Sequence, residues 1–287
     1  MITFHDFVAA FQKLELKHTT PVIVHASLSA FGDVQGGAET VLGALIYIFD
    51  TLLMPGFTYK TMITPQFGPL DNGLDYSQSQ PANQMAQFYR PAMPVDRLMG
   101  VLSEALRQHP RSRRSSHPIL SFVGLNAGSC LESQTLAEPL KPLERLVEAK
   151  GWVLLLGVDH TVNTSLHYAE RLAGRKQFVR WALTPDGVLE CARFPGCSDG
   201  FGQLAPRLEP IIRQMQVGVG LVQALPLEQL VAVARAWINA DPQALLCDRS
   251  YCERCAAVRK SASTGQRLEN YKQIEDSFDS DFTGGRK

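Results

Sequence analysis

The chain has 287 residues, of which 45% are hydrophobic and 20% are charged. This is an ordinary globular composition, and the length suits one large α/β domain or two small ones. Its 28 basic residues balance its 28 acidic residues, so the charge gives no support for a general nucleic-acid-binding or membrane-binding surface. No apolar run approaches transmembrane length, and residues 1–7 lack the pattern of a signal peptide, so we expect a cytoplasmic protein.

The first part of the chain alternates between helical and strand patterns. Residues 3–16 are expected to form an amphipathic helix, and residues 21–25 a buried strand. Residues 26–37 are rich in serine and glycine, which is typical of a loop, and a helix should follow from residue 38. Residues 51–57 predict a second strand.

A long segment with little periodicity follows over residues 64–84, and long loops in compact domains are often functional. Beyond it, helices are expected over residues 96–108 and 227–240, and strands over 121–124, 152–158 and 181–194, the last with a turn at 185–187. This alternation predicts an α/β fold.

Residues 151–170 are the stretch most informative about function. Trp152 to Val158 is a continuous apolar run, typical of a strand buried on both faces. A helix should begin near Asn163, a plausible N-cap, and Thr164, His167 and Glu170 then recur at three-residue steps. A solvated helix face would show the same spacing, but ligands in α/β proteins gather at the carboxyl ends of strands, where this helix begins. The three side chains are therefore candidate catalytic residues.

Two polar turns are candidate binding elements. Ser27, Ser29, Gly36 and Gly37 lie in a loop between a strand and a helix, which can aim backbone N–H groups at phosphate or pantetheine oxygens, although any tight turn has this composition. The second turn, residues 114–118, reads Arg-Ser-Ser-His-Pro.

Three late cysteines, Cys247, Cys252 and Cys255, have the spacing Cys-x4-Cys-x2-Cys. The second pair has zinc-ligand spacing, but a fourth ligand would have to come from Cys191 or Cys197, far away in the sequence. Because thiols stay reduced inside cells, buried or free thiols are the default, so we assign no metal and leave zinc binding open.

A serine-hydrolase motif, Gly-x-Ser-x-Gly, is matched around Ser198. That motif needs a strand running directly in and a helix running directly out. Pro195 before it and Pro206 after it disfavour this arrangement.

Taken together, these blocks resemble the aminoglycoside 3-N-acetyltransferase family, also called the antibiotic N-acetyltransferase family. The matching stretches follow the family's order and span residues 20–258; they are residues 25–29, 36–40, 53–58, 93–100, 114–118, 154–157, 163–170, 196–201 and 252–255.

The resemblance implies a single-domain α/β fold, a three-layer α/β/α sandwich with a mixed central sheet, distinct from the fold of histone-type acetyltransferases. We expect this domain over residues 1–262 and a polar, partly disordered tail over residues 263–287.

The family's activity is transfer of an acetyl group from acetyl-CoA to the 3-amino group of the 2-deoxystreptamine ring of aminoglycosides, which gives antibiotic resistance. The resemblance places the catalytic pair on His167 and Glu170. It places the CoA-channel residues on Ser27, Leu28, Ser29, Gly36, Gly37, Arg114 and Ser115.

The chemistry assigns a role to each catalytic candidate. A protonated amine cannot attack a thioester, and an imidazole can accept its proton near neutral pH, so His167 is expected to be the general base. Glu170 would orient the ring, and Thr164 could donate to the oxyanion of the tetrahedral intermediate. Because no cysteine lies near His167 in the sequence, we expect direct transfer in a ternary complex.

The acceptor is less well defined than the reaction. Aminoglycosides are polycations, and Asp71, Asp75 and Asp199 are the carboxylates expected to bind them. Two alternatives stay open, namely an acyl-CoA-dependent transferase acting on another small amine, and a non-catalytic small-molecule or zinc-binding module. The sequence does not indicate an oligomeric state.

Overall fold

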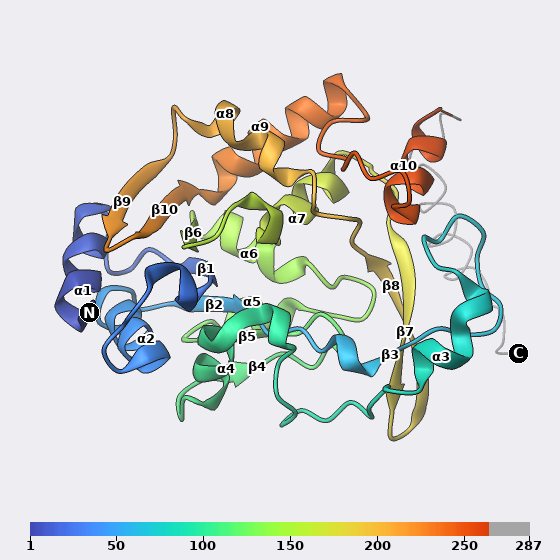
Figure 1. Ribbon diagram of the computed structural model, residues 1–287, viewed down its shortest axis with the longest axis horizontal. Coiled ribbons are helices and arrows are strands. Elements are labelled where there is room, and N and C mark those ends of the chain that lie inside the picture. Colours follow the sequence, from blue (N-terminus) through green and yellow to red (C-terminus); the bar gives the residue numbers. More distant parts are fainter. Residues whose placement is uncertain (264–287) are drawn as a thin grey trace, which may run out of the picture.

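A mixed sheet of seven strands forms the centre of the molecule (Figure 1), in the order β4-β5-β2-β1-β6-β10-β9. The computed structural model describes residues 1–263. The strands are β1 (Val22–Ala26), β2 (Leu52–Pro55), β4 (Arg113–Arg114), β5 (Phe122–Leu125), β6 (Trp152–Leu156), β9 (Arg213–Val217) and β10 (Gly220–Pro226). β1 pairs in parallel with β2 and β6, and the outer pairings are antiparallel.

The central strands β1, β2, β5 and β6 are buried on both faces, as continuous apolar runs predict. Successive side chains of a strand point to opposite faces. Ile23 of β1 and Val153 of β6 therefore enter one core, and their neighbours Val24 and Leu154 enter the other.

Helices cover each face of this sheet. One face packs against α1 (Phe4–Lys13), α2 (Gly37–Ile48) and α4 (Gly100–Gln108). The other face packs against α5 (Gly128–Ser133), α6 (Lys141–Glu148), α7 (Ser165–Leu172) and α9 (Leu227–Ala240). The result is the predicted three-layer sandwich with a mixed central sheet.

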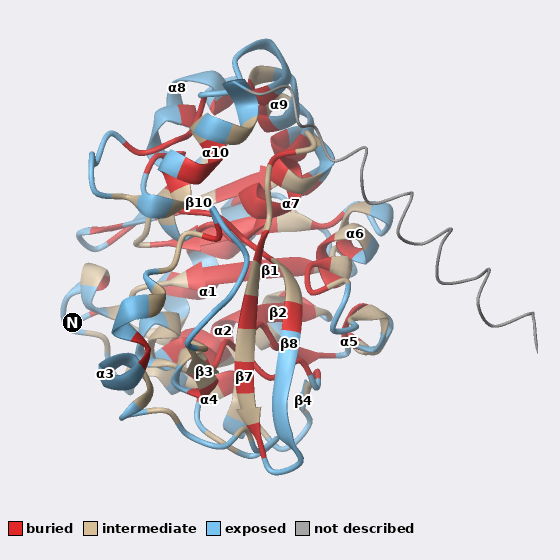
Figure 2. Ribbon diagram, turned by 90° about the vertical axis from the view of Figure 1, so that its right-hand side faces the viewer, coloured by how far each residue is buried: buried red, intermediate tan, exposed pale blue. Residues whose placement is uncertain are grey.

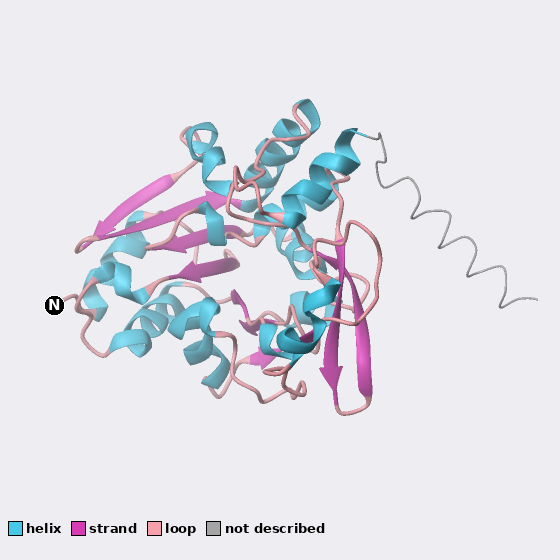
Figure 3. Cartoon of the chain, turned by 45° about the vertical axis from the view of Figure 1, so that its right-hand side comes forward, coloured by secondary structure: helices cyan, strands magenta, loops and turns pink. Residues whose placement is uncertain are grey.

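A second, smaller sheet stands apart from the first (Figure 3), in the order β3-β7-β8. Its strands are β3 (Met62–Ile63), β7 (Phe178–Thr184) and β8 (Gly187–Phe194). β7 and β8 form a hairpin, and the first half of β8 is exposed (Figure 2). The short helices α3 (Ser79–Asn83) and α8 (Ala205–Leu208) and the helix α10 (Glu253–Ser263) complete the described fold.

The helix expected over residues 227–240 coincides with α9, while β7 begins earlier than the predicted residue 181. The segment over residues 64–84 contains α3, and α10 was not expected at all. The predicted single domain over residues 1–262 stays a prediction, and the tail beyond residue 263 lies outside the described residues. Among the described helices, none has the length and apolar character needed to cross a membrane.

Candidate active site

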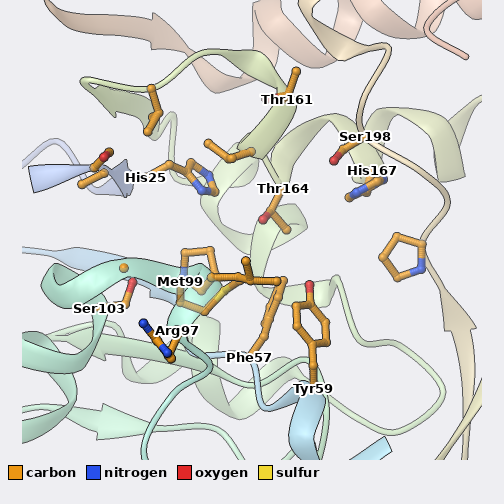
Figure 4. Close-up of a pocket in the computed structure, with 18 of the residues that line it drawn as sticks. His25, Phe57, Tyr59, Arg97, Met99, Ser103, Thr161, Thr164, His167 and Ser198 are labelled. Carbon is orange, nitrogen blue, oxygen red and sulfur yellow. The ribbon is translucent and has the colours of Figure 1, made fainter. Parts of the chain in front are cut away.

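A cavity of about 1250 Å³ opens at the carboxyl ends of the parallel strands β1, β2 and β6. Residues of the small sheet, including Arg180 of β7, form part of its wall. In Figure 4, Thr164, His167 and Ser198 lie on one side of the cavity, opposite Phe57 and Tyr59. Pockets for one small molecule typically measure about 300–1000 Å³, so this cavity has room for two substrates.

The turn between β6 and α7 aims the catalytic candidates at this cavity. Gly157 ends the strand with φ +65°, and a Cβ there would lie 2.5 Å from the Cβ of Ala30, so only glycine fits. Thr164, and not Asn163 as predicted, is the N-cap of α7, and Asn163 lies one residue before it, where its Oδ1 accepts a hydrogen bond from the Ser165 N–H at 3.1 Å. Leu166 packs into the core on the other side of the helix.

His167, Glu170 and Arg175 form a chain of hydrogen bonds behind the cavity. The Nδ1 of His167 lies 2.8 Å from Oε2 of Glu170, whose Oε1 accepts a hydrogen bond from Nη1 of Arg175 at 2.8 Å. Arg175 Nη2 also donates to the carbonyl oxygens of Pro242 and Ala244. Glu170 is 1% exposed, and each of its two carboxylate oxygens has a partner within the protein.

The geometry of these hydrogen bonds orients the imidazole of the catalytic candidate. Nδ1 of His167 points to the Glu170 carboxylate, and a carboxylate oxygen is a hydrogen-bond acceptor. Nε2 is then the ring nitrogen left for a ligand in the cavity, and the ring packs against Phe201 with centroids 4.8 Å apart.

Arg175 was missed by the sequence analysis. It follows Glu170 by five residues, a spacing that does not place two side chains on one helix face. The chain leaves α7 and turns through Gly174, which has φ +72°, and this turn brings the guanidinium back to Glu170.

The predicted CoA-channel residues divide into two groups. Ser27, Leu28 and Ser29 line the cavity, with the hydroxyl oxygens of Ser27 and Ser29 3.1 Å apart. Gly36 and Gly37 are not among the cavity residues, since they form the start of α2.

Arg114 and Ser115 also lie outside the cavity wall. The Arg114 guanidinium donates to the carbonyl oxygens of Gly56 and Met93, and to the hydroxyl of Ser121. Ser115 is tied to Phe122 by backbone and side-chain hydrogen bonds. Ser115 thus joins the residue after β4 to β5, and Arg114 joins β4 to the segments that carry Gly56, Met93 and Ser121.

Of the three predicted acceptor carboxylates, Asp199 alone lines the cavity, and its Oδ2 pairs with Arg249 Nη1 at 2.7 Å. Asp71 pairs with Lys260 at 2.7 Å on the outer side of α10. Asp75 accepts hydrogen bonds from the N–H and hydroxyl of Ser77.

Three arginines and a histidine in the cavity wall were not predicted: Arg97, Arg180, Arg254 and His25. Burial, reinforced by nearby Arg254, lowers the pKa of Arg180 to about 10, which leaves it charged at neutral pH. Burial also lowers the pKa of His25 to about 3, with a further contribution from His160, so its imidazole is neutral. The position of His25 at the end of β1 was the signal that could have identified it.

Ser198 lines the cavity but does not lie on a nucleophile elbow. β8 ends at Phe194, and a 3-10 helix over Phe201–Leu204 follows the motif in place of an α-helix. The hydrolase hypothesis therefore lacks its required geometry.

Comparison with known proteins gives a family match over most of the chain. The family model described as aminoglycoside 3-N-acetyltransferase matches residues 23–239. Aminoglycoside N(3)-acetyltransferase III from a Salmonella species is 31% identical over 251 residues, which is 78% of this chain and 86% of that protein.

Solved structures give the same result. The YokD protein from Bacillus subtilis superposes with a TM-score of 0.73 at 26% identity, covering 84% of this chain and 94% of YokD. The aminoglycoside acetyltransferase AAC(3)-IVa, as apoenzyme, has a TM-score of 0.73 at 25% identity, covering 91% of this chain and 97% of that one. Two neighbours carry ligands: AAC-IIIb is bound to CoASH, and an AAC(3)-IVa mutant is in complex with gentamicin, both at 24% identity.

These relatives are acetyltransferases, so the non-catalytic alternative is wrong. The fold is theirs, as predicted, and not that of histone-type enzymes. Because the family model matches residues 23–239 and the Salmonella relative is 31% identical in sequence, this chain belongs to the aminoglycoside 3-N-acetyltransferase family of acyltransferases.

Proposed function

We propose that this chain transfers the acetyl group of acetyl-CoA to the 3-amino group of the 2-deoxystreptamine ring of an aminoglycoside, with His167 as general base. The observation that carries the proposal is the series of hydrogen bonds that links His167, Glu170 and Arg175. It leaves one imidazole nitrogen available to a ligand, in a cavity with room for two substrates. The family supplies the reaction class. We place the reaction in the cytoplasm, where acetyl-CoA is available.

The proposed reaction is a direct transfer. His167 Nε2 takes a proton from the acceptor amine while the nitrogen attacks the thioester carbonyl, and Glu170 stabilises the imidazolium that forms. The Thr164 hydroxyl, one turn before His167 on the cavity wall, donates to the developing oxyanion. Collapse of the tetrahedral intermediate breaks the C–S bond, and the imidazolium returns its proton to the CoA thiolate.

Acetyl-CoA is the proposed acetyl donor, in line with the CoASH bound by the neighbour AAC-IIIb. Ser27, Leu28 and Ser29 on the cavity wall offer hydroxyl groups and an apolar surface to the pantetheine arm. Arg97 also lines the cavity and is exposed, which suits it to the phosphate groups.

Asp199 is the proposed carboxylate for the acceptor amines, since it lines the same cavity as His167. The neighbour bound to gentamicin supports an acceptor of this class.

A second acceptor class is favoured by the charge of the cavity wall. Arg97, Arg180 and Arg254 line the cavity, whereas Asp199 is the sole carboxylate among the described lining residues and is paired with Arg249. A polycation would meet repulsion from this wall. An amine with a single positive charge, or one that also carries an acidic group, suits it better.

Acetyl-CoA turnover with a panel of amines tests both candidates. The purified chain is incubated with acetyl-CoA and either aminoglycosides or simple amines with one charge, and released CoA is detected with a thiol reagent. Release with aminoglycosides, with one acetyl group gained by the product, is the expected result. CoA release with the simple amines alone would favour the second acceptor class over aminoglycosides. No CoA release with either kind of amine would refute the proposed function.

A further inference from the structure

Four cysteines from three separate segments meet beside the cavity. Cys197 lies in the loop after β8, Cys247 follows α9, and Cys252 and Cys255 lie at the start of α10. Their Sγ atoms all lie within 4.8 Å of one another. Three of the four side chains are buried, and Cys252 is half-buried. Cys197 is thus the distant fourth partner that the Cys-x4-Cys-x2-Cys pattern lacked.

The distances fit a tetrahedral metal site. Zinc bound by four thiolates at about 2.3 Å separates each pair of sulfur atoms by about 3.8 Å. The Sγ atoms of Cys247 and Cys255 are 3.5 Å apart, and no pair exceeds 4.8 Å. The observed 3.5 Å is also far beyond the about 2.05 Å of a disulfide bond. Four thiolates in this arrangement are the donor set of structural zinc.

We propose that Cys197, Cys247, Cys252 and Cys255 bind one structural zinc ion. Four protein ligands leave no open position for a substrate, so the ion has no direct part in the reaction. The proposed zinc site also does not depend on which amine is the acceptor.

The surroundings supply the compensating charge. A zinc ion with four thiolates carries a net charge of −2, and basic side chains of α10 reach the ligand segments. Arg254 donates to the carbonyl oxygen of Gly196 at 2.8 Å, and Arg259 to that of Cys247 at 2.6 Å.

The proposed ion would join three segments that build the active site. The loop with Cys197 also carries Ser198 and Asp199, and α10 carries Arg254, all of which line the cavity. The segment before Cys247 supplies the Ala244 carbonyl that holds Arg175. Zinc would therefore fix the part of the cavity wall that carries Asp199 relative to the Ala244 carbonyl that holds Arg175.

Metal analysis of the full chain tests the proposal. The protein is purified without chelator, its affinity tag is removed, and zinc and iron are measured by mass spectrometry. We expect about one zinc per chain, as in a closed four-thiolate site, and loss of most of it in Cys255→Ser. The matched control is Cys191→Ser, a buried cysteine of β8 outside the cluster, which should keep the wild-type zinc content. Stoichiometric iron in place of zinc, or full zinc in Cys255→Ser, would overturn the assignment.

A second measurement covers the case in which Cys255→Ser fails to fold. Zinc is removed from the wild-type chain with a chelator under reducing conditions, and Co²⁺ is added. The expected spectrum has the thiolate-to-cobalt charge-transfer and ligand-field bands of a tetrahedral four-thiolate site. The thermal midpoint should fall on zinc removal and recover with Zn²⁺ but not with Mg²⁺. A wild-type chain that takes up neither metal, with an unchanged midpoint, would contradict the proposal.

Discussion

At the residue scale, the site depends on how one imidazole is held. The Glu170 carboxylate is divided between two partners, since one oxygen meets Nδ1 of His167 and the other meets Arg175. Both oxygens of this carboxylate are therefore hydrogen-bonded at 1% exposure. The imidazole proposed as the base is oriented by two side chains that lie outside the cavity wall.

Replacement of Glu170 tests that orientation. In Glu170→Gln the amide cannot stabilise the imidazolium and can favour the wrong tautomer, so kcat should fall by about 10²- to 10⁴-fold. The CoA dissociation constant should stay nearly unchanged, because Glu170 is not among the residues that line the cavity. Turnover measurements with calorimetric CoA titration check both. A dissociation constant that rises as steeply as kcat falls would contradict the assigned role.

Buried histidines predict the pH dependence of stability. The pKa of His25 falls from 6.5 to about 3 on folding, so below pH 6.5 the unfolded state binds a proton that the folded state does not. Stability is therefore lost as the pH falls from 6.5 towards 3. Between pH 7 and pH 5, His25 alone should contribute a loss of about 2 kcal/mol.

Urea unfolding of the wild type and His25→Gln at both pH values checks this prediction. The variant should lose less stability than the wild type. The remaining loss would come from groups such as His117, whose pKa burial lowers to about 4. An equal loss in the two proteins would show that His25 is protonated in the folded state.

At the scale of elements, α7 is the part that joins the core to the chemistry. Leu166 and Ala169 face the core, while Thr164 and His167 face the cavity. The strand before this helix was predictable because an apolar run is a local signal, whereas the N-cap lies at Thr164, one residue after the predicted Asn163. α10 was not predicted, because it depends on contacts with segments distant in the sequence, such as the ion pair between Lys260 and Asp71.

Truncation of Leu166 tests the packing of α7. Leu166 is fully buried between helix and sheet, so Leu166→Ala should reduce the free energy of unfolding by about 2–5 kcal/mol. Leu172 at the end of the same helix is 38% exposed, and Leu172→Ala is the matched control with a much smaller expected loss. Denaturant unfolding of both variants measures the difference. Similar losses would mean that α7 is not anchored through Leu166.

At the scale of the whole molecule, the topology decides which predicted residues meet. The carboxyl ends of β1 and β6 bring Ser27 and His167 to one cavity, as α/β architecture predicts. Arg114 was expected there because of its motif, but the pairing of β4 with β5 directs its guanidinium to backbone carbonyl groups. Arg175 was not predicted because it reaches Glu170 only through the turn at Gly174. Cys197 could not be preferred over Cys191 from the sequence, because a long connection separates it from Cys247.

The positive cavity wall predicts how salt affects acetyl-CoA binding. The KM for acetyl-CoA should rise with ionic strength, because salt screens the proposed contact between the phosphates of CoA and exposed Arg97. Arg97→Gln should raise that KM at low salt by up to about fivefold, as expected for one exposed ion pair, and flatten its salt dependence. Arg111→Gln, an exposed arginine outside the cavity, is the control. A salt dependence that is unchanged in Arg97→Gln would place the phosphates elsewhere.

The central claim is that His167 is the base in acetyl transfer from acetyl-CoA. The most direct test compares the steady-state rates of CoA release and amine acetylation in three proteins: the wild type, His167→Ala and the control His160→Gln. The thermal midpoint of each variant shows whether it is folded. In His167→Ala, kcat should fall by about 10²- to 10⁴-fold, with an almost unchanged KM for acetyl-CoA. The control, a buried histidine outside the cavity wall, should lose far less. A folded His167→Ala variant that retains the wild-type rate, or equal losses at both positions, would show that His167 is not the base.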